Sequence, residues 1–495
     1  MRSFSSNKKG LFNSSVIIYV IGTLLLLNGF LMLCCVPFAI YYDEENFYKT
    51  FLFCSIFTIF FGFLLRFLTK EDKNAEIKKR DGYLIVVGGW LCMSLFGSLP
   101  YLFTGSIPSF TNAFFETMSG FTTTGSTILD NIESLPMSIL FWRSMTQWIG
   151  GMGIIVLTIA ILPLLGIGGM ELFVAEAPGP TKDKIHPRIK ETAKRLWLIY
   201  FSLTALETVI LMCLGLSFFD AINHALTTTS TGGFSTKQAS IAAFQNPFVE
   251  AVIVVFMFLA GTNFTMIYFG LKFRFKKIIN NDEFKWYLSA ILLVVFLLTA
   301  YRTITSSLDF SQAFREISFQ VVSIITTTGY ATADYTLWGS FFTFIFFLFL
   351  FSGASAGSTS GGIKIVRIVL LIKNGFLEFK RRLHPKAVIP VMINKKVVSS
   401  TITYNLLAFI FLYLFVFTIG SLFLSLLGVD MLTSISAVAS AVGNVGPGIA
   451  DVGPSHSFAH LPNTAKWILS FLMLMGRLEL FTVCVLFTPY FWKRN

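Results

Sequence analysis

Long apolar runs alternate with short polar links along most of this chain. Two runs near 16–40 and 46–69 each reach the roughly 20 residues that a membrane-spanning helix needs, and a charged link at 70–81 follows them. Further runs lie near 82–104, 136–166, 193–218, 247–273, 284–306, 337–374, 397–428 and 464–492. This pattern predicts an all-α integral membrane protein, because helices satisfy their own backbone hydrogen bonds inside a bilayer.

Four shorter apolar segments lie between these runs, near 109–121, 219–228, 310–325 and 431–442. At about 1.5 Å per residue a helix of this length covers only about half of a bilayer. Each segment is therefore expected to enter the membrane and return on the same side. Such a re-entrant backbone is tolerated only where surrounding protein shields it from lipid.

A turn containing glycine follows each short segment. The third turn, at 326–331, reads Thr-Thr-Thr-Gly-Tyr-Ala and nearly matches the Thr-Val-Gly-Tyr-Gly filter of potassium channels. Related turns read Thr-Thr-Thr-Gly-Ser-Thr at 122–127, Thr-Ser-Thr-Gly-Gly-Phe at 229–234 and Gly-Asn-Val-Gly-Pro-Gly at 443–448. We align Gly125, Gly232, Gly329 and Gly446, which are spaced by 107, 97 and 117 residues. The near-regular interval predicts four copies of one unit of about 100 residues.

The residue types in these turns suit a filter made of backbone oxygens. A ring of carbonyl groups can replace the hydration shell of a cation without adding net charge. Glycine permits the unusual backbone angles that this requires. The residues before the glycines are Thr124, Thr231, Thr328 and Val445. For one turn alone, a motif for packing helices is the simpler interpretation, whereas four turns in matching context favour a filter.

These elements predict five parts: a two-helix hairpin with its link at 1–81, and four pseudo-symmetric units at 82–192, 193–283, 284–396 and 397–495. Each unit contains a helix, a re-entrant pore helix and a second helix, and the units surround a central pore. One chain could thus form a whole pore.

The distribution of charge predicts the orientation of the chain. The hydrophobic fraction is 54%, the charged fraction is 13%, the mean hydropathy is +0.72 and the net charge is +12. If the N-terminus is cytoplasmic, the inner links hold 30 of the 38 Lys and Arg residues, as membrane orientation requires. This explains the positive charge better than nucleic-acid binding does. The C-terminus is then also cytoplasmic, and the four turns face outward.

Several acidic residues are expected on the same outer face as the turns: Asp130, Glu133, Asp220, Asp334 and Asp451. Carboxylates around a pore mouth would raise the local cation concentration. Ordinary solvated loop residues are the alternative interpretation.

Together with the turns, four further motifs give the chain a family resemblance. They read Trp-Ile-Gly-Gly-Met-Gly-Ile at 148–154, Glu-Ala-Pro-Gly-Pro at 176–180, Gly-Ser-Thr-Ser-Gly-Gly-Ile-Lys at 357–364 and Gly-Arg-Leu-Glu at 476–479. The chain resembles the membrane subunit of the bacterial Trk potassium uptake system, in a superfamily with the Ktr and plant HKT transporters. The resemblance covers essentially the whole chain.

The resemblance implies a potassium-permeable, multi-pass pore protein of the bacterial inner membrane that assembles as a homodimer. K⁺, or Rb⁺ in its place, would be the transported ion, and the chain itself would hold no cofactor. A nucleotide is expected on a separate cytosolic ring of RCK-type regulatory subunits, which would contact the basic segments 182–195 and 373–396. Within that superfamily, a serine in place of the first filter glycine looks like a change that favours sodium. This chain has Gly125 at that position, so the resemblance implies a preference for potassium.

The turns depart from the channel consensus at its second glycine. The matching positions are Thr127, Phe234, Ala331 and Gly448, and only the last is glycine. We expect fewer ordered carbonyl layers than in a potassium channel, and therefore looser discrimination against sodium.

The segment 353–362, Gly-Ala-Ser-Ala-Gly-Ser-Thr-Ser-Gly-Gly, is predicted to be an unwound loop at mid-membrane depth. Each internal glycine costs a helix about 1 kcal/mol, and the segment contains Gly353, Gly357, Gly361 and Gly362. An unwound segment must line water or pack on protein, so we place it beneath the filter as a gate, where the resemblance also implies a gating loop. Close helix packing is the alternative.

Arg477 lies inside the last apolar run, where a charge costs about 2.5–3.5 kcal/mol at the bilayer centre. It is therefore predicted to face the pore as a barrier to cations, as the resemblance also implies. An ion pair with Glu479 or another acid is the alternative. His456 and His460 have a spacing that suits zinc on a helix, but they lie in an outer Pro/Gly-rich segment without a third ligand.

Two transport mechanisms fit the sequence: passive movement of K⁺ through a gated pore, and symport of K⁺ with H⁺ or Na⁺. A membrane potential of about 150 mV sustains roughly 300-fold accumulation without coupling, so energetics does not separate them. A purely structural scaffold is a third possibility, for which changes at the turns would have no effect on ion flux.

Overall fold

The computed structural model describes residues 12–69, 79–151, 153 and 189–493. This part of the chain is almost entirely helical and contains one short hairpin, β1 (Met392–Ile393) with β2 (Lys396–Val397). Six of the described helices are long and apolar enough to span a membrane, and two bent pairs of helices could each form one more span. The chain is thus a helical membrane protein, as its sequence predicts.

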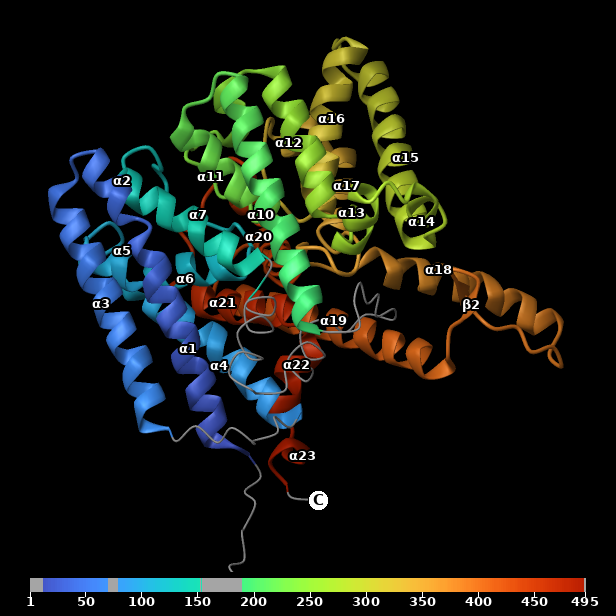
Figure 1. Cartoon of the computed structure of the whole chain (residues 1–495). Helices are drawn as coiled ribbons and strands as arrows, with labels where there is room; N and C mark the ends of the chain where they lie inside the picture. Colours follow the sequence, from blue (N-terminus) through green and yellow to red (C-terminus); the bar gives the residue numbers. More distant parts are fainter. Residues whose placement is uncertain (1–11, 70–78, 152, 154–188, 494–495) are drawn as a thin grey trace, which may run out of the picture.

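The N-terminal hairpin packs through glycine. Helices α1 (Ser14–Leu33) and α3 (Glu45–Leu68) lie side by side and are joined by α2 (Val36–Tyr41), so the predicted run 16–40 is two helices (Figure 1). A Cβ on Gly22 would lie 2.8 Å from the carbonyl oxygen of Gly62. Such close backbone approach gives the van der Waals contact that holds apolar helices together in lipid.

Four half-length helices occupy the interior, as the short segments predict. They are α6 (Phe110–Phe121), α11 (Phe218–Thr229), α16 (Phe310–Ile325) and α20 (Met431–Gly443). Each packs against the longer helix that precedes it in the chain. These longer helices are α4 (Lys79–Gly97), which is followed by α5 (Leu99–Phe103), then α10 (Ile189–Cys213), α15 (Asp282–Thr305) and α19 (Ser400–Leu426). The C-terminal half of each short helix is buried in protein.

Three of the helices that follow the four turns are interrupted within the described residues. The described part of the first is α7 (Met137–Gly151), and its predicted extension to residue 166 lies outside the described residues apart from 153. The third is divided into α17 (Ser340–Phe349) and α18 (Ile365–Leu383).

The predicted continuous helices 247–273 and 464–492 are wrong. The chain bends by 108° between α12 (Pro247–Ala260) and α13 (Phe264–Leu271), and by 115° after α21 (Asn463–Arg477), before α22 (Leu480–Cys484). At the first bend the side chain of Asn263 caps α13 by accepting a hydrogen bond from the Thr265 amide. At the second, Glu479 adopts a left-handed φ of 58°, which a continuing helix cannot contain.

Both described ends of the chain meet on one face of the molecule. The ring of Phe12 stacks on that of Phe491 at 5.6 Å, and Arg80 at the start of α4 donates a 2.8 Å hydrogen bond to the Lys493 carbonyl. Figure 1 also shows α18, the β-hairpin and the N-terminal part of α19 extending away from the other helices. The remaining short elements are η1 (Ser240–Phe244), α14 (Phe275–Ile279), η2 (Tyr335–Trp338), η3 (Ala450–Val452), η4 (Val485–Phe487) and α23 (Pro489–Trp492).

Candidate functional site

Each half-length helix ends in the same hydrogen-bonded turn. One residue near the helix end adopts a left-handed φ of 51–58°, and these residues are Thr123, Thr231, Thr327 and Asn444. The next amide donates a hydrogen bond of 2.9–3.0 Å to the carbonyl five residues earlier; the pairs are Thr124 with Ser119, Gly232 with Thr227, Thr328 with Ser323 and Val445 with Ser440. A glycine with φ between 78° and 104° follows, at Gly125, Gly233, Gly329 and Gly446. Four segments far apart in sequence thus share one local geometry.

The predicted register of the second turn is wrong by one residue. Gly233, and not Gly232, has the positive φ of the other three glycines, while Gly232 occupies the position of Thr124, and Thr231 that of Thr123. Because Gly232 and Gly233 are adjacent, the sequence offered two alignments, and only the backbone angles separate them. With the corrected register, Ser235 rather than Phe234 matches the second glycine of the channel consensus.

The four turns contact one another in a closed order. A Cβ added to Gly125 would lie 2.2 Å from the carbonyl oxygen of Gly232, in the second turn. The corresponding distances are 1.9 Å from Gly233 to the oxygen of Thr328, 2.1 Å from Gly329 to that of Val445 and 2.8 Å from Gly446 to that of Thr124. The fourth turn therefore closes on the first. We call this arrangement the turn ring.

Two buried amide side chains brace the turn ring. Gln147 of α7 donates a 2.7 Å hydrogen bond to the Gly232 carbonyl and accepts a 3.0 Å hydrogen bond from the Phe234 amide. Asn444 donates 2.9 Å hydrogen bonds to the Thr124 hydroxyl and to the Met473 carbonyl. Neither role was predicted from the sequence, although Gln147 is the one amide side chain in the apolar run 136–166.

A buried ion pair joins the first and second turns. Glu116 of α6 and Arg143 of α7 lie 2.9 Å apart, and their side chains are 0% and 1% exposed. Glu116 also accepts hydrogen bonds from the Thr127 hydroxyl and the Ile128 amide, while Arg143 donates to the Ser235 carbonyl at 3.1 Å. This pair was not predicted from the sequence, although both charges lie in predicted membrane segments.

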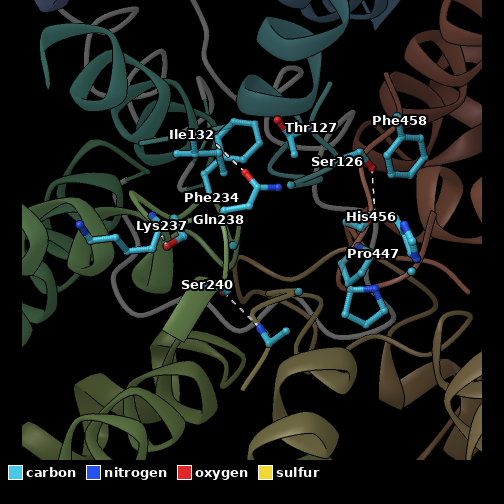
Figure 2. Close-up of a pocket in the computed structure, with 18 of the residues that line it drawn as sticks. Ser126, Thr127, Ile132, Phe234, Lys237, Gln238, Ser240, Pro447, His456 and Phe458 are labelled. Carbon is cyan, nitrogen blue, oxygen red and sulfur yellow. Dashed lines mark hydrogen bonds between the residues drawn. The ribbon is translucent and has the colours of Figure 1, made fainter. Parts of the chain in front are cut away.

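A pocket opens beside the turn ring, and we call it the outer pocket (Figure 2). Residues of all four turns contribute to its lining, including Gly125, Gly233, Gly329 and Gly446. The charged and titratable residues that line it are Arg143, Lys237 and His456. Figure 2 shows cross-links between outer segments, such as the 3.2 Å hydrogen bond that the Ile132 amide donates to the Gln238 side chain.

The five outer acidic residues do not line this pocket. They accept hydrogen bonds within the outer segments instead. The pairs are Asp130 with Ser457, Glu133 with the Gln238 amide, Asp220 with Thr236, Asp334 with Ser455 and Asp451 with Thr433. These acids thus hold outer segments together, and their effect on the local cation concentration stays a prediction.

The predicted unwound segment is confirmed as a loop at 350–364, which we call the unwound loop. Gly357 and Gly362 have φ values of 74° and 62°, and a Cβ on Gly353 would lie 2.2 Å from the Gly361 carbonyl oxygen. The loop lies directly against the turns. The Gly361 amide donates a 2.7 Å hydrogen bond to the Thr327 hydroxyl, and the Thr359 hydroxyl donates one of 3.2 Å to the Thr229 carbonyl.

Comparison with known proteins shows which family has this sequence. Residues 46–494 match the family described as TrkH, cation transport protein. The chain belongs to the TrkH family. It is 38% identical to the Trk system potassium uptake protein TrkH of Halomonas elongata, over 97% of this chain and 99% of that protein. It is 42% identical to the protein of the same name in Escherichia coli K12, over 87% of this chain and 90% of that protein.

A solved structure agrees with this assignment. The crystal structure of the potassium transporter TrkH from Vibrio parahaemolyticus superposes with a TM-score of 0.87 and 37% sequence identity, covering 97% of this chain and all of that one. The motif-based resemblance is thereby confirmed. As a member of the TrkH family, the chain is a membrane transport protein and not an enzyme.

The motifs of this TrkH-family chain fall in separate places. The motif 357–364 lies in the unwound loop, and the motif 476–479 lies at the bend after α21. Residues 148–151 of the motif 148–154 form the end of α7. The Glu-Ala-Pro-Gly-Pro motif at 176–180 and the first half of the basic segment 182–195 lie outside the described residues.

Arg477, at the end of α21, links the unwound loop to α7. It donates 2.7 Å hydrogen bonds to the carbonyls of Thr359 and Gly151, and a further hydrogen bond to that of Gly150. Glu479, its expected alternative partner, forms an ion pair with Arg367 of α18. Arg477 therefore contacts the segment predicted to act as the gate.

Proposed function

We propose that this TrkH-family chain takes up potassium through a gated pore in the bacterial inner membrane, with the turn ring as its selectivity filter. The observation that carries the proposal is the closed order of contacts among the four turns, which brings four backbone carbonyl groups together. Relatives that match nearly the whole chain are named potassium uptake proteins. Four pseudo-equivalent units at 82–192, 193–283, 284–396 and 397–495 would then surround the pore, with the hairpin 1–81 beside them.

The filter would act through the carbonyl groups before the glycines, which are those of Thr124, Gly232, Thr328 and Val445. Their oxygens would replace water around K⁺ or Rb⁺, the ion that the chain would transport without any cofactor of its own. The second consensus position holds Thr127, Ser235, Ala331 and Gly448. Only one of these four positions is glycine. We therefore infer fewer carbonyl layers than in a potassium channel, and weaker exclusion of sodium.

The unwound loop would be the gate. Gly353, Gly357, Gly361 and Gly362 allow its irregular backbone, and its hydrogen bonds reach Thr327 in the third turn. Since each hydrogen bond contributes about 0.5–1.5 kcal/mol net, moving such a loop aside is within reach of a regulatory partner. Arg477 would favour the closed state by holding Thr359 and by placing a positive charge near the pathway.

Replacing Arg477 by glutamine is expected to increase resting potassium flux about fivefold. The shorter amide keeps at most one of the three hydrogen bonds, so two bonds of about 0.5 kcal/mol each are lost together with the positive charge. Rubidium uptake into potassium-loaded liposomes measures this. Arg382→Gln is the matched control, since it removes the same charge from a side chain that is 80% exposed. An Arg477→Gln protein whose resting flux equals that of the control would argue against the barrier.

The proposed assembly is a homodimer in lipid, with a separate cytosolic ring of RCK-type subunits that binds the nucleotide. Both termini would be cytoplasmic. The contact between Phe12 and Phe491 supports placing the two ends of the chain on the same side of the membrane. The links on that side hold most of the Lys and Arg residues, which supports its being the cytoplasmic side.

Reversal potentials of the purified protein in planar bilayers test the proposed function. Passive movement predicts a reversal potential that follows the potassium gradient and does not shift when pH or sodium changes at fixed potassium. A shift with either ion would instead indicate symport with H⁺ or Na⁺. The absence of rubidium flux, both for the chain alone and with its regulatory subunits, would refute a transport role for the chain.

A further inference from the structure

One carboxyl group lies deep in the membrane region without a hydrogen-bond partner. Glu207 of α10 is 0% exposed, and neither of its carboxylate oxygens forms a hydrogen bond within the described residues. It is the only charged residue between Leu196 and Cys213. At about 1.5 Å per residue it lies roughly 9 Å from the C-terminal end of α10. A charged side chain at such depth marks a functional candidate.

Glu207 faces the half-length helix α11. The hydroxyls of Thr204 in α10 and Thr229 in α11 are 2.9 Å apart and fix the two helices against each other. One turn further along α10, the carboxyl of Glu207 approaches the hydroxyl of Thr228 without forming a full hydrogen bond. The carboxyl thus lies beside the C-terminal end of α11.

A short polar path leads from this carboxyl to the third turn. The hydroxyl of Tyr330 lies 3.4 Å from that of Thr228 and is hydrogen-bonded to that of Thr227. It also donates a 3.1 Å hydrogen bond to the His224 carbonyl. Tyr330 directly follows Gly329 of the turn ring, so the position of its ring is tied to the backbone of that turn.

No opposite charge compensates Glu207 in the described structure. Within the described residues, Tyr330 is the titratable group that the charge of Glu207 reaches along the polar path. His224 of α11 lies beyond Tyr330, and its ring nitrogens are bonded to the Ser235 hydroxyl and the Asp220 carbonyl. The nearest basic residues on α10 itself, Lys194 and Arg195, lie about three turns earlier. Helix α12 carries Glu250, which pairs with Arg315 at 3.2 Å, and α13 carries no charged residue.

We propose that Glu207 is a membrane-buried proton-binding site that controls the turn ring through Tyr330. A burial of this kind is costly for an uncompensated carboxylate, and one proton bound to a carboxylate oxygen removes the charge and supplies the missing donor. The new hydroxyl then donates to the Thr228 oxygen, which leaves the hydrogen bonds of Tyr330 as they are. When the proton leaves to water, the carboxylate accepts the Thr228 hydrogen, which the structure shows donated to the His224 carbonyl at 2.7 Å. Because Tyr330 donates to the same carbonyl, the hydroxyls around Tyr330 must then reorient.

The expected consequence is a potassium preference that depends on pH. This second part rests on the proposed function of the turn ring, whereas proton binding itself does not. Loss of one hydrogen bond behind the third turn corresponds to about a threefold change in an equilibrium constant. We therefore expect the potassium-over-sodium permeability ratio to fall about threefold as pH rises through the titration of Glu207.

Two measurements on the full-length protein test the site. Infrared difference spectroscopy detects the carbonyl stretch of a protonated carboxyl group, and we expect Glu207→Gln to lose one such band that Glu45→Gln retains. Glu45 is the matched control because its side chain is 74% exposed. Permeability ratios against pH form the second measurement. Glu207→Gln, which is uncharged at every pH, is expected to have a flat profile, and Tyr330→Phe is expected to keep the infrared band but lose the pH response.

Either of two results overturns the proposal: a protonated-carboxyl band that survives in Glu207→Gln, or pH profiles of wild type and Glu207→Gln that superimpose. Failure of the proposed function looks different. In that case the wild type shows no potassium preference at any pH, while the infrared band still decides whether Glu207 binds a proton.

Discussion

A serine at position 329 is expected to lower the potassium-over-sodium permeability ratio about 30-fold, the equivalent of about 2 kcal/mol of backbone strain and lost filter geometry. Gly329 has φ = 82°, and its Cβ would lie 2.1 Å from the Val445 carbonyl oxygen in the neighbouring turn. Because that neighbour is backbone, the contact is relieved only by moving one turn away from the other. Bi-ionic reversal potentials in reconstituted bilayers measure the ratio.

Gly428→Ser provides the matched control. Gly428 has φ = 85°, nearly the same as Gly329, but a Cβ there would meet no atom within 4 Å. It therefore carries the conformational cost of a positive φ without the contact between turns. Permeability ratios that are equal in the two variants would show that the contact at Gly329 is irrelevant to selectivity.

Glu116→Gln is expected to be the most destabilising single change considered, with a loss of about 3–5 kcal/mol in the free energy of unfolding. The variant leaves Arg143, whose side chain is 1% exposed, without its counter-charge. It also weakens the hydrogen bonds that hold Thr127 and Ile128, so the first turn should lose its fixed position. Thermal unfolding in detergent and the potassium-over-sodium ratio in bilayers are the two readouts.

Two further variants isolate the role of this pair. Adding Arg143→Met to Glu116→Gln removes the uncompensated charge and should restore part of the stability, but not the bond to Ser235 that links the turns. Glu378→Gln is the control for an exposed pair, because Glu378 is 52% exposed beside Arg381 and such pairs contribute at most about 1 kcal/mol. If Glu116→Gln is as stable as Glu378→Gln, the pair does not clamp the turns.

The sequence predicted those features that depend on segment length and residue type. The four half-length helices follow from apolar segments too short to cross a bilayer, and the unwound loop follows from Gly353, Gly357, Gly361 and Gly362 within ten residues. The breaks at Asn263 and Glu479 were missed because hydropathy is the same on both sides of each bend. Local capping and a single left-handed residue decide them.

Features that depend on three-dimensional neighbours could not be predicted. The adjacent Gly232 and Gly233 made the second turn ambiguous, since only one of them contacts the carbonyl of Thr328. Glu116 and Arg143 are 27 residues apart in different predicted segments, so nothing in the sequence paired them. The outer acids illustrate the converse: their positions on one face were predicted, but each forms hydrogen bonds within the outer segments rather than lining the pocket.

Anomalous scattering from crystals grown in rubidium tests the central claim most directly. The account predicts one or more rubidium peaks on the axis of the turn ring, at coordination distance from the carbonyl oxygens of Thr124, Gly232, Thr328 and Val445, and their weakening in Gly329→Ser. Rubidium bound elsewhere in the protein with no peak inside the turn ring would contradict it.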